Sequence, residues 1–277
     1  MSRRTVEFHS PTLSILECHC SGGDCSPSEL RCTENTHIAL TSAGGFVVDG
    51  GSRMVVAEGC RAVYNPSGTE YRVSHLRGAS HSYTVLQPAE HLWDLIPRAS
   101  PRAPDLVDVR YGMATVTAHV ALRSHLANHA CDRLALEESA MDVLASLTLP
   151  ANGQARLRAS RIRRAVLRAR EELAGRVGEN IGIEELASVA GCSPFHLARA
   201  FRSETGQSVR RYRLHLRLAR ALHLVAADHE DLALIATTCG FASQSHMSAA
   251  FQAVLGVTPS HSRRHFRQIK AQLKTKA

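Results

Sequence analysis

The spacing of apolar residues divides the chain into a front part that predicts strands and a back part that predicts helices. In the first hundred residues, apolar and polar positions alternate in short runs, which is typical of half-buried strands. Turn-forming residues separate the runs at Asp49-Gly50-Gly51, Glu58-Gly59 and Pro66-Ser67-Gly68. The predicted strands span residues 36–40, 45–49, 53–57, 61–65, 71–75 and 83–86. Short strands at this spacing predict a small β-barrel or β-sandwich.

After Pro101 and Pro104 the apolar spacing becomes that of helices. One helix is predicted around Val116 to Leu126 and another around Leu134 to Leu147, with a break near residues 128–132. Such a pair can pack against its copy in a homodimer or against its own β-domain, and no heptad repeat is long enough to decide. Pro150 to Gln154 mark a linker, which we assign to residues 150–159.

A further helix is predicted from Ser160 onward. Its apolar residues share one face, and these are Ile162, Val166, Ala169, Leu173 and Val177. This face is expected to cover the helices that follow in the chain. The other faces carry most of the arginines, namely Arg161, Arg163, Arg164, Arg168 and Arg170. Some of these could contact DNA phosphates, and the majority are expected to remain in solvent.

Residues 183–264 contain the same helical pattern twice. The recurring residues are Leu186-Ala187 and Gly191, which return 49 positions later as Ile235-Ala236 and Gly240, and Ser193, His196, Phe201 and Gly206, which return 50 positions later as Ser243, His246, Phe251 and Gly256. In each copy a glycine that can adopt positive φ separates two short helices, and a serine caps the second helix. Two short helices joined by such a turn form a helix-turn-helix. One such pattern is weak evidence, whereas two at a fixed spacing are strong evidence.

These residues resemble the AraC/XylS family of transcription regulators. The first unit contains LAxxAGxSxxHLxRxFxxxTG, and the second contains IAxxxGFxSQSHMSxxF followed by GVTPSxxRR. The resemblance covers residues 160–267 closely and the front half only loosely. It implies that the second helix of each unit enters a successive major-groove face of double-stranded DNA, and that RNA polymerase is a partner. The segment VVAEGCRAVYNPSGTEYRVSH also resembles cupin-like sensing domains, which implies a ligand pocket but identifies no effector.

The fold prediction that results is an α+β chain with four parts. Residues 1–100 form a cupin-like β-barrel, residues 101–149 a helical extension, residues 150–159 the linker, and residues 160–277 an all-α domain with two helix-turn-helix units. The predicted function is that of a sequence-specific DNA-binding transcription regulator, controlled by a small-molecule effector at the N-terminal domain.

In the first recognition helix, the outward positions carry the candidate base contacts. The resemblance places the groove-reading positions on Phe195, Ala198 and Arg199. Arg199 is the strongest candidate, because a guanidinium presents paired donors to guanine O6 and N7. Ala198 can at most touch a thymine methyl, and Phe195 either does the same or belongs to the core. Arg202 is expected to contact a phosphate, which positions the helix without reading bases.

The second recognition helix departs from the family pattern. Ala249 stands where relatives commonly carry an arginine, and Gln252 stands where they carry a basic residue. Glutamine can address adenine with two hydrogen bonds, but serines are permissive readers. We therefore expect the first half of a bound site to be read strictly and the second half loosely. The complete set of expected DNA contacts is Ser193, Phe195, His196, Arg199, Arg202, Ser243, Gln244, Ser245, His246, Ser248, Arg263 and Arg264.

A helix from Val209 to Val225 is predicted to join the two units and to fix the distance between their recognition helices. Recognition helices on one face of B-DNA must lie about 34 Å apart, or the duplex must bend to meet them. The tail from His265, with Lys270, Lys274 and Lys276, is expected to form an extra electrostatic grip or a disordered end.

The charge distribution supports the same division. Residues 156–277 hold 21 Arg and Lys against 9 Asp and Glu, a net of +12, whereas residues 1–155 hold 12 against 16, a net of −4. A basic half beside a mildly acidic half is what a DNA-binding domain next to a separate sensing domain would show. No apolar run approaches the ~18 residues of a membrane span, and no signal-peptide core is seen. A cytoplasmic location without a membrane partner is therefore expected.

Four cysteines gather near the N-terminus, namely Cys18, Cys20, Cys25 and Cys32. If the segment is a strand, Cys18 and Cys20 share one face and His19 lies on the other. Such thiolates could bind a soft metal or be oxidised, so the alternative function is a metal or redox stress sensor with DNA binding as its output. Neither C-x-x-C nor a regular zinc-knuckle spacing is present, which favours cysteines that only fill strand and loop positions.

An enzymatic metal centre is not expected. Cupin oxygenases carry a His-x-His pair, a carboxylate and a later histidine, because a divalent metal needs several converging ligands. Here His37, His75, His81 and Glu70 are isolated on the predicted strands. No catalytic residue and no cofactor are therefore assigned, and the histidines are expected to be surface or polar-network residues.

Overall fold

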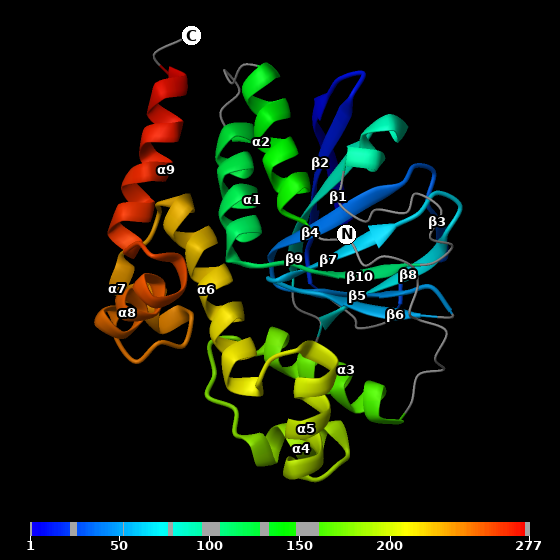
Figure 1. Cartoon of the computed structure of the whole chain (residues 1–277), viewed down its shortest axis with the longest axis vertical. Coiled ribbons are helices and arrows are strands. Elements are labelled where there is room, and N and C mark those ends of the chain that lie inside the picture. The colour runs from blue at the N-terminus through cyan, green and yellow to red at the C-terminus, as the bar shows by residue number, and fades with distance from the viewer. Residues whose placement is uncertain are drawn as a thin grey trace.

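The computed structural model describes residues 2–22, 27–51, 53–76, 80–95, 106–127, 133–147 and 161–274. Figure 1 shows the strands of the N-terminal part gathered on one side, with the C-terminal helices beside and below them. This mixture of sheets and helices confirms the α+β class. The predicted linker and the predicted break at 128–132 lie outside the described residues, and the domain boundaries stay predictions.

The strands form two antiparallel sheets. The order in the larger sheet is β1 (Ser2–His9), β2 (Leu13–Cys20), β9 (His81–Pro88), β4 (His37–Ala43), β7 (Arg61–Asn65) and β10 (Val107–Arg110). The order in the smaller sheet is β3 (Arg31–Cys32), β8 (Glu70–His75), β5 (Phe46–Asp49) and β6 (Met54–Ala57). A short 3-10 helix, η2 (Glu90–Leu95), follows β9.

The two sheets share an apolar core. Its buried members come from both sheets and include Leu16, Ala39, Val63, Val85, Phe46, Val48 and Val55. The sheets meet at the turn between β6 and β7, where Glu58 and Arg61 form an isolated bridge. Among the described strands no ladder closes the two sheets, which pack as a β-sandwich, so the cupin-like barrel is not confirmed.

All six predicted strands are present close to their expected positions, whereas β1, β2, β3 and β10 were not predicted. β2 is buried on both faces over most of its length, so the residues from Leu13 to Cys20 lack the alternation that marks a half-buried strand. β10 follows Pro101 and Pro104, where the sequence predicted only helices.

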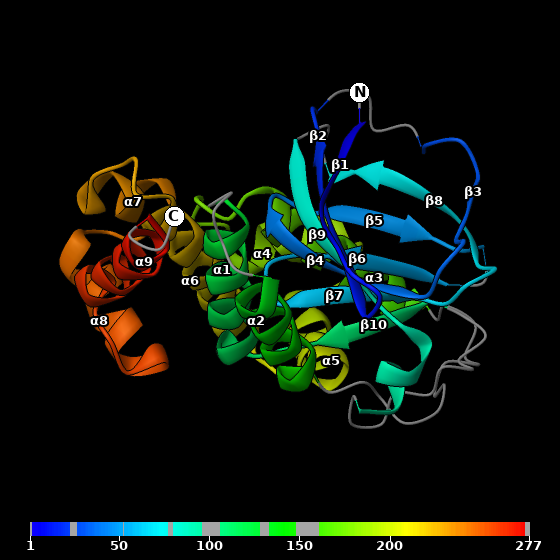
Figure 2. The same cartoon turned by 90° about the horizontal axis from the view of Figure 1, so that it is seen from above.

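Two helices cover the outer face of the larger sheet. α1 (Met113–Leu126) and α2 (Arg133–Ser146) confirm the predicted helical pair. Ala140 and Val143 of α2 share a buried cluster with Ile15, Ile38 and Leu86 of the sheet. The pair therefore packs on its own β-domain, which was one of the two expected arrangements. α1 lies between α2 and the C-terminal helices (Figure 2).

Residues 161–274 form a helical domain. Its helices are α3 (Arg161–Gly175), α4 (Ile183–Ala190), α5 (Pro194–Thr205), α6 (Val209–Ala227), α7 (Leu232–Thr238), α8 (Gln244–Leu255) and α9 (Pro259–Lys274). α6 contributes Tyr212 and Leu216 to one apolar core and Leu222 and Val225 to another. With 19 residues in one continuous helix, it is about 28 Å long and holds the two cores apart. No helix in the described ranges is long and apolar enough to cross a bilayer.

The C-terminal tail is helical, contrary to one of the expectations for it. Phe266 of α9 is buried in the same core as Phe251 of α8. The Lys270 Nζ donates a hydrogen bond to the Ala226 carbonyl at 2.6 Å, so this lysine ties α9 to α6 and is not a free electrostatic grip. The side chain of Lys274 and the whole of Lys276 lie outside the described residues.

Candidate nucleic-acid interface

Each of the helices α5 and α8 begins just after a glycine turn. Gly191 and Gly240 adopt φ values of 71° and 78°, a left-handed conformation that glycine reaches without strain. Ser193 then caps α5, because its Oγ accepts the backbone N–H three residues later at 3.3 Å. Ser243 caps α8 in the same way at 3.1 Å. The two units therefore share their local geometry, as the repeated pattern predicted.

The outer face of α5 carries an aromatic ring and two cations. Phe195 is 79% exposed, so it does not belong to the core. Arg199 and Arg202 are exposed, and among the described residues neither guanidinium has an ion-pair partner. Ala198 and His196 are exposed beside them. The buried residues on the inner face are Leu197, Ala200 and Phe201.

The outer face of α8 carries no Arg or Lys. Gln244, Ser245 and His246 are exposed, and Ser248 is half-buried. The Ala242 amide donates to His246 Nδ1 at 3.3 Å, so the neutral ring keeps its proton on Nε2 and can donate from that atom. α8 therefore offers neutral hydrogen-bonding groups where α5 offers guanidinium groups.

The two arginines near the start of α9 have different surroundings. Arg263 Nη2 donates to the Glu230 carbonyl at 2.7 Å, and its Nε lies 3.3 Å from Asp228 Oδ1. Its guanidinium is therefore paired within the protein, and the contact of Arg263 with DNA stays a prediction. Arg264 is exposed and remains a candidate contact.

Comparison with known proteins identifies this part of the chain. Residues 186–265 match a family model described as a helix-turn-helix domain. The chain is 34% identical over 92 residues to the HTH-type transcriptional regulator Rv1931c of Mycobacterium tuberculosis, covering 33% of this chain and 36% of that protein. It is 35% identical over 83 residues to an AraC-like transcription regulator of Streptomyces antibioticus, covering 30% of this chain and 27% of that protein. Residues 186–265 are an AraC-type helix-turn-helix domain.

The likeness to the two sequence relatives named above covers about a third of this chain. The chain spans between 27% and 36% of the length of these two curated relatives. The solved DNA-binding domain of AdpA, a global transcriptional factor crystallised with a target DNA, aligns at 25% identity and a TM-score of 0.37. That alignment covers 39% of this chain and 97% of the AdpA domain.

The described cysteines near the N-terminus lie on strands of the β-sandwich and in unlike surroundings. Cys18 and Cys20 are buried on one face of β2 while His19 is exposed on the other, as predicted for a strand. Cys32 is exposed on β3 of the smaller sheet, and Cys25 lies outside the described residues. Within the described ranges, no group of three or more His, Cys, Asp or Glu could hold a metal ion. The metal or redox sensor alternative is therefore not supported.

The strand histidines belong to polar networks, as expected. His37 bonds to the Asn35 carbonyl at 3.0 Å and to the Asn65 amide at 3.2 Å. The Nδ1 atoms of His75 and His81 lie 3.1 Å apart between β8 and β9. Burial, and then the neighbouring His75, lower the pKa of His81 to about 4, so this ring is neutral near pH 7.

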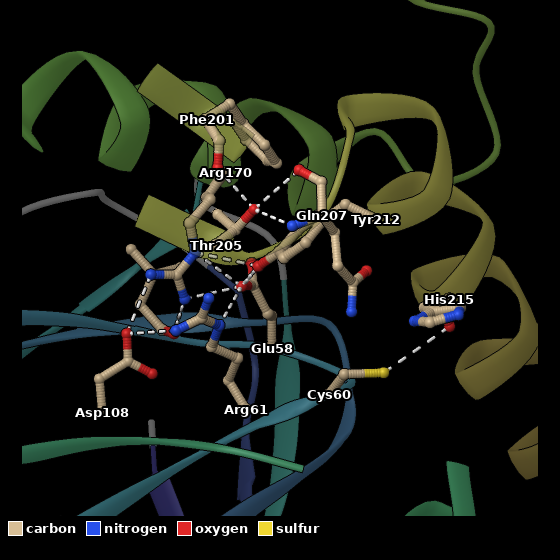
Figure 3. A network of polar contacts seen from close by, with 11 residues as sticks. Glu58, Cys60, Arg61, Asp108, Arg170, Phe201, Thr205, Gln207, Tyr212 and His215 are labelled. Carbon is tan, nitrogen blue, oxygen red and sulfur yellow. Dashed lines mark hydrogen bonds and ion pairs between the residues drawn. The ribbon is translucent and has the colours of Figure 1, made fainter. Parts of the chain in front are cut away.

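A buried network of charged residues joins the β-sandwich to the AraC-type domain, and the sequence did not reveal it (Figure 3). Arg170 of α3 donates from Nη2 and Nε to Glu58 at 2.7 and 2.9 Å, and from Nη1 to Asp108 at 3.1 Å. Arg61 Nη1 bonds to the same Asp108 oxygen at 2.7 Å. The Tyr212 hydroxyl of α6 donates to Glu58.

Burial and pairing act in opposite directions on the two carboxyl groups. Burial raises the pKa of Glu58, and the guanidiniums of Arg170 and Arg61 oppose that rise. Burial also acts to raise the pKa of Asp108, but the same two arginines bring it below its ordinary value. Glu58 and Arg170 are 112 positions apart, and most arginines of this helix had been expected to remain in solvent, so no local pattern could have paired them.

Proposed function

We propose that this protein is a transcription regulator that binds double-stranded DNA in a sequence-specific manner. The observation that carries the proposal is the pair of capped helices α5 and α8, which present exposed polar faces from one basic AraC-type domain. α6 holds their units apart as one continuous helix. In the bound state the two helices enter successive major-groove faces, and the duplex bends if their separation departs from about 34 Å.

The first unit reads bases. Arg199 donates two hydrogen bonds to guanine O6 and N7, and Phe195 and Ala198 meet thymine methyl groups. Arg202 and His196 contact phosphates and fix the register of the helix. This assignment is supported by the exposure of all five side chains and by the position of Arg199 midway along the outer face of α5.

The second unit holds the duplex with less discrimination. Gln244 addresses adenine, while Ser245, Ser248 and His246 accept a wider range of partners. The helix N-termini capped by Ser193 and Ser243 and the exposed Arg264 bind phosphates. The absence of Arg and Lys from α8 supports this division of roles.

The N-terminal domain controls this activity through an effector, and RNA polymerase and a second copy of the chain are partners in the cytoplasm. The space between the sheets is filled with apolar side chains. An open cavity of about 430 Å³ lies instead near η2 and the β1–β2 turn, and His9, Ser10, Asn35, Gln87 and Trp93 are among its lining residues. A small polar effector fits this mixed lining.

Selection of binding sites from a random duplex library with the full chain tests the proposal. The expected result is an enriched site with two halves spaced by about one helical turn, carrying more sequence information in one half than in the other. Binding that falls steeply with salt but enriches no sequence would contradict sequence reading and would leave only a nonspecific grip on DNA.

A further inference from the structure

The turn between β6 and β7 is inserted against the AraC-type domain. An added Cβ on Gly59 would lie 3.0 Å from the Ala219 side chain of α6, so the turn backbone approaches the helix closely. The thiol of the next residue, Cys60, donates a hydrogen bond to the His215 carbonyl oxygen at 3.8 Å. The turn is therefore part of the packing around α6.

Glu58, on the other side of the same turn, reaches two helices of the AraC-type domain. Its side chain is fully buried and bonds to Arg170 of α3 and to Tyr212 of α6, as Figure 3 shows. Arg170 Nε also lies 2.9 Å from the Tyr212 hydroxyl oxygen, and its Nη2 donates to the Val56 carbonyl at 2.8 Å. Among the described residues, both carboxylates that pair with Arg170 come from the β-sandwich.

Tyr212 and α3 are also the supports of the first recognition helix. The Tyr212 ring meets Phe201 of α5 edge to face, with ring centroids 5.1 Å apart. Phe201 is fully buried and lies two residues after Arg199 on the same helix. α3 packs against α5 as well. A short chain of contacts therefore runs from Glu58 through Tyr212 and Phe201 to the base-reading face.

We infer that Glu58 is a positioning residue for base reading by the first helix-turn-helix unit. The inference rests on the proposed function. The β-sandwich supplies a buried carboxylate that fixes α3 and the start of α6, and these two helices set the place of α5. Glu58 itself touches no DNA and acts only through the residues that it orients.

Among the described residues, no carboxylate of the β-sandwich bonds directly to α7, α8 or α9 of the second unit. α8 packs through Met247 and Phe251 into an apolar core that it shares with Val116 and Val120 of α1. Loss of the Glu58 carboxylate therefore leaves the support of α8 in place. The effect on DNA reading is confined to the half-site that the first unit contacts.

The test compares full-length variants on the duplex that wild-type protein selects. Glu58→Ala removes the carboxylate, and Tyr212→Phe removes only the hydroxyl while the ring stays against Phe201. Asp228→Asn is the matched control, because it weakens an ion pair with Arg263 and Arg267 inside the second unit. Affinity is measured for every single-base change in both half-sites, and amide hydrogen exchange is followed in α5 and α8. The half-site of the first unit is the one whose base preferences Arg199→Ala weakens.

Glu58→Ala is expected to lower affinity about tenfold and to flatten base preference in the first half-site, a loss within the range that one bidentate base contact supplies. Exchange should rise in α5 and stay unchanged in α8. Tyr212→Phe should give a smaller change of the same kind, and Asp228→Asn should leave first-half preference intact.

Two results would overturn the inference. One is a Glu58→Ala protein that keeps the wild-type preference at every first-half position. The other is an equal loss in both halves with equally raised exchange in α5 and α8, which would make Glu58 a general support of the fold. If Glu58→Ala fails to fold, unchanged first-half preference in Tyr212→Phe would overturn it alone. A wild-type protein that selects no site would instead remove the proposed function on which the inference rests.

Discussion

The two helix-turn-helix units have the same local construction and different surroundings. Both place a left-handed glycine before a serine-capped helix, and both bury a phenylalanine at the same point of that helix. On the outer face, Arg199 of the first unit corresponds to Ala249 of the second. The repeated residues therefore specify a scaffold, whereas the residues that differ specify what each scaffold does.

The units also differ in how they join the rest of the chain. The first is joined through the buried charges of Glu58, Asp108, Arg61 and Arg170, with Ala174 of α3 in a small apolar contact beside them. The second is joined through the apolar face of α1. Apolar packing tolerates changes of shape with modest loss, but a buried charge that loses its partner is costly. The first unit is therefore the one more closely dependent on particular residues of the β-sandwich.

The largest expected loss of stability follows from removing the Arg170 side chain. Arg170→Ala leaves the buried Glu58 and Asp108 with Arg61 alone as a cationic partner, and we expect the free energy of unfolding to fall by about 3–5 kcal/mol. Urea unfolding followed by circular dichroism measures the change. Arg267→Ala is the control, because it breaks an ion pair that lies at the surface of the second unit. Equal losses of unfolding free energy in the two variants would show that the buried charges between the domains contribute no more than a surface ion pair.

A gain in base discrimination is expected when an arginine is placed on the outer face of α8, which carries no Arg or Lys. Ala249→Arg places a guanidinium at the position that corresponds to Arg199, and a new bidentate contact to guanine would add about 1–3 kcal/mol of discrimination. Site selection with the variant should enrich a guanine in the second half-site. An unchanged second half would mean that α8 does not lie in the groove as α5 does.

Acid is expected to weaken the contact beside the second unit. His119 of α1 and His223 of α6 lie with ring centroids 5.5 Å apart, and Arg123 and Glu17 face them. Burial, followed by the charge of Arg123, lowers the pKa of His223 to about 3. Burial also lowers the pKa of His119 well below its ordinary value. Both rings are therefore neutral in the folded protein at pH values where they are charged in the unfolded chain.

The sign of the pH effect follows from these lowered pKa values. Below about pH 6.5 the unfolded chain binds protons that the folded chain does not, so stability falls by up to about 1.4 kcal/mol per pH unit for each histidine. For His223 the loss continues down to about pH 3. Unfolding measured from pH 7 to pH 5 should show a shallower slope for His223→Gln than for wild type. His261→Gln, an exposed change on α9, should keep the wild-type slope.

The smallest expected loss of stability comes from removing a helix cap. This loss should be equal in the two units. Ser193→Ala and Ser243→Ala each remove a side-chain cap, and we expect each to cost about 1 kcal/mol of stability. Thermal unfolding of the two variants checks this. A large difference between them would contradict the view that the repeat specifies equivalent scaffolds.

The features that could be predicted from the sequence are those with a local signal. Alternation located the strands from β4 to β9, and the glycine and serine positions located both turns and both caps. β2 escaped because it is buried on both faces, and the sandwich could not be separated from a barrel because sheet closure depends on edges far apart in the chain. The outward position of Phe195 was left open because its helical position suits a core or a surface residue equally.

Two arginines have surroundings that the sequence did not reveal. Arg263 and Arg170 were judged by charge alone, and both guanidiniums are held by partners that lie far away in the sequence. An arginine on a basic domain gives no local sign of whether it faces DNA or a distant carboxylate. Only the packing of α9 on α6, and of α3 on the β-sandwich, decides between these roles.

The most direct test of the account is a base-by-base affinity scan of the selected duplex with wild-type protein and with Arg199→Ala. The account predicts that one guanine in one half-site accounts for about 1–3 kcal/mol of discrimination in wild type, and that the variant loses this discrimination there while every second-half preference stays unchanged. A uniform loss of affinity across all sequences would contradict it, because Arg199 would then be a phosphate contact and the first unit would not read DNA through this residue.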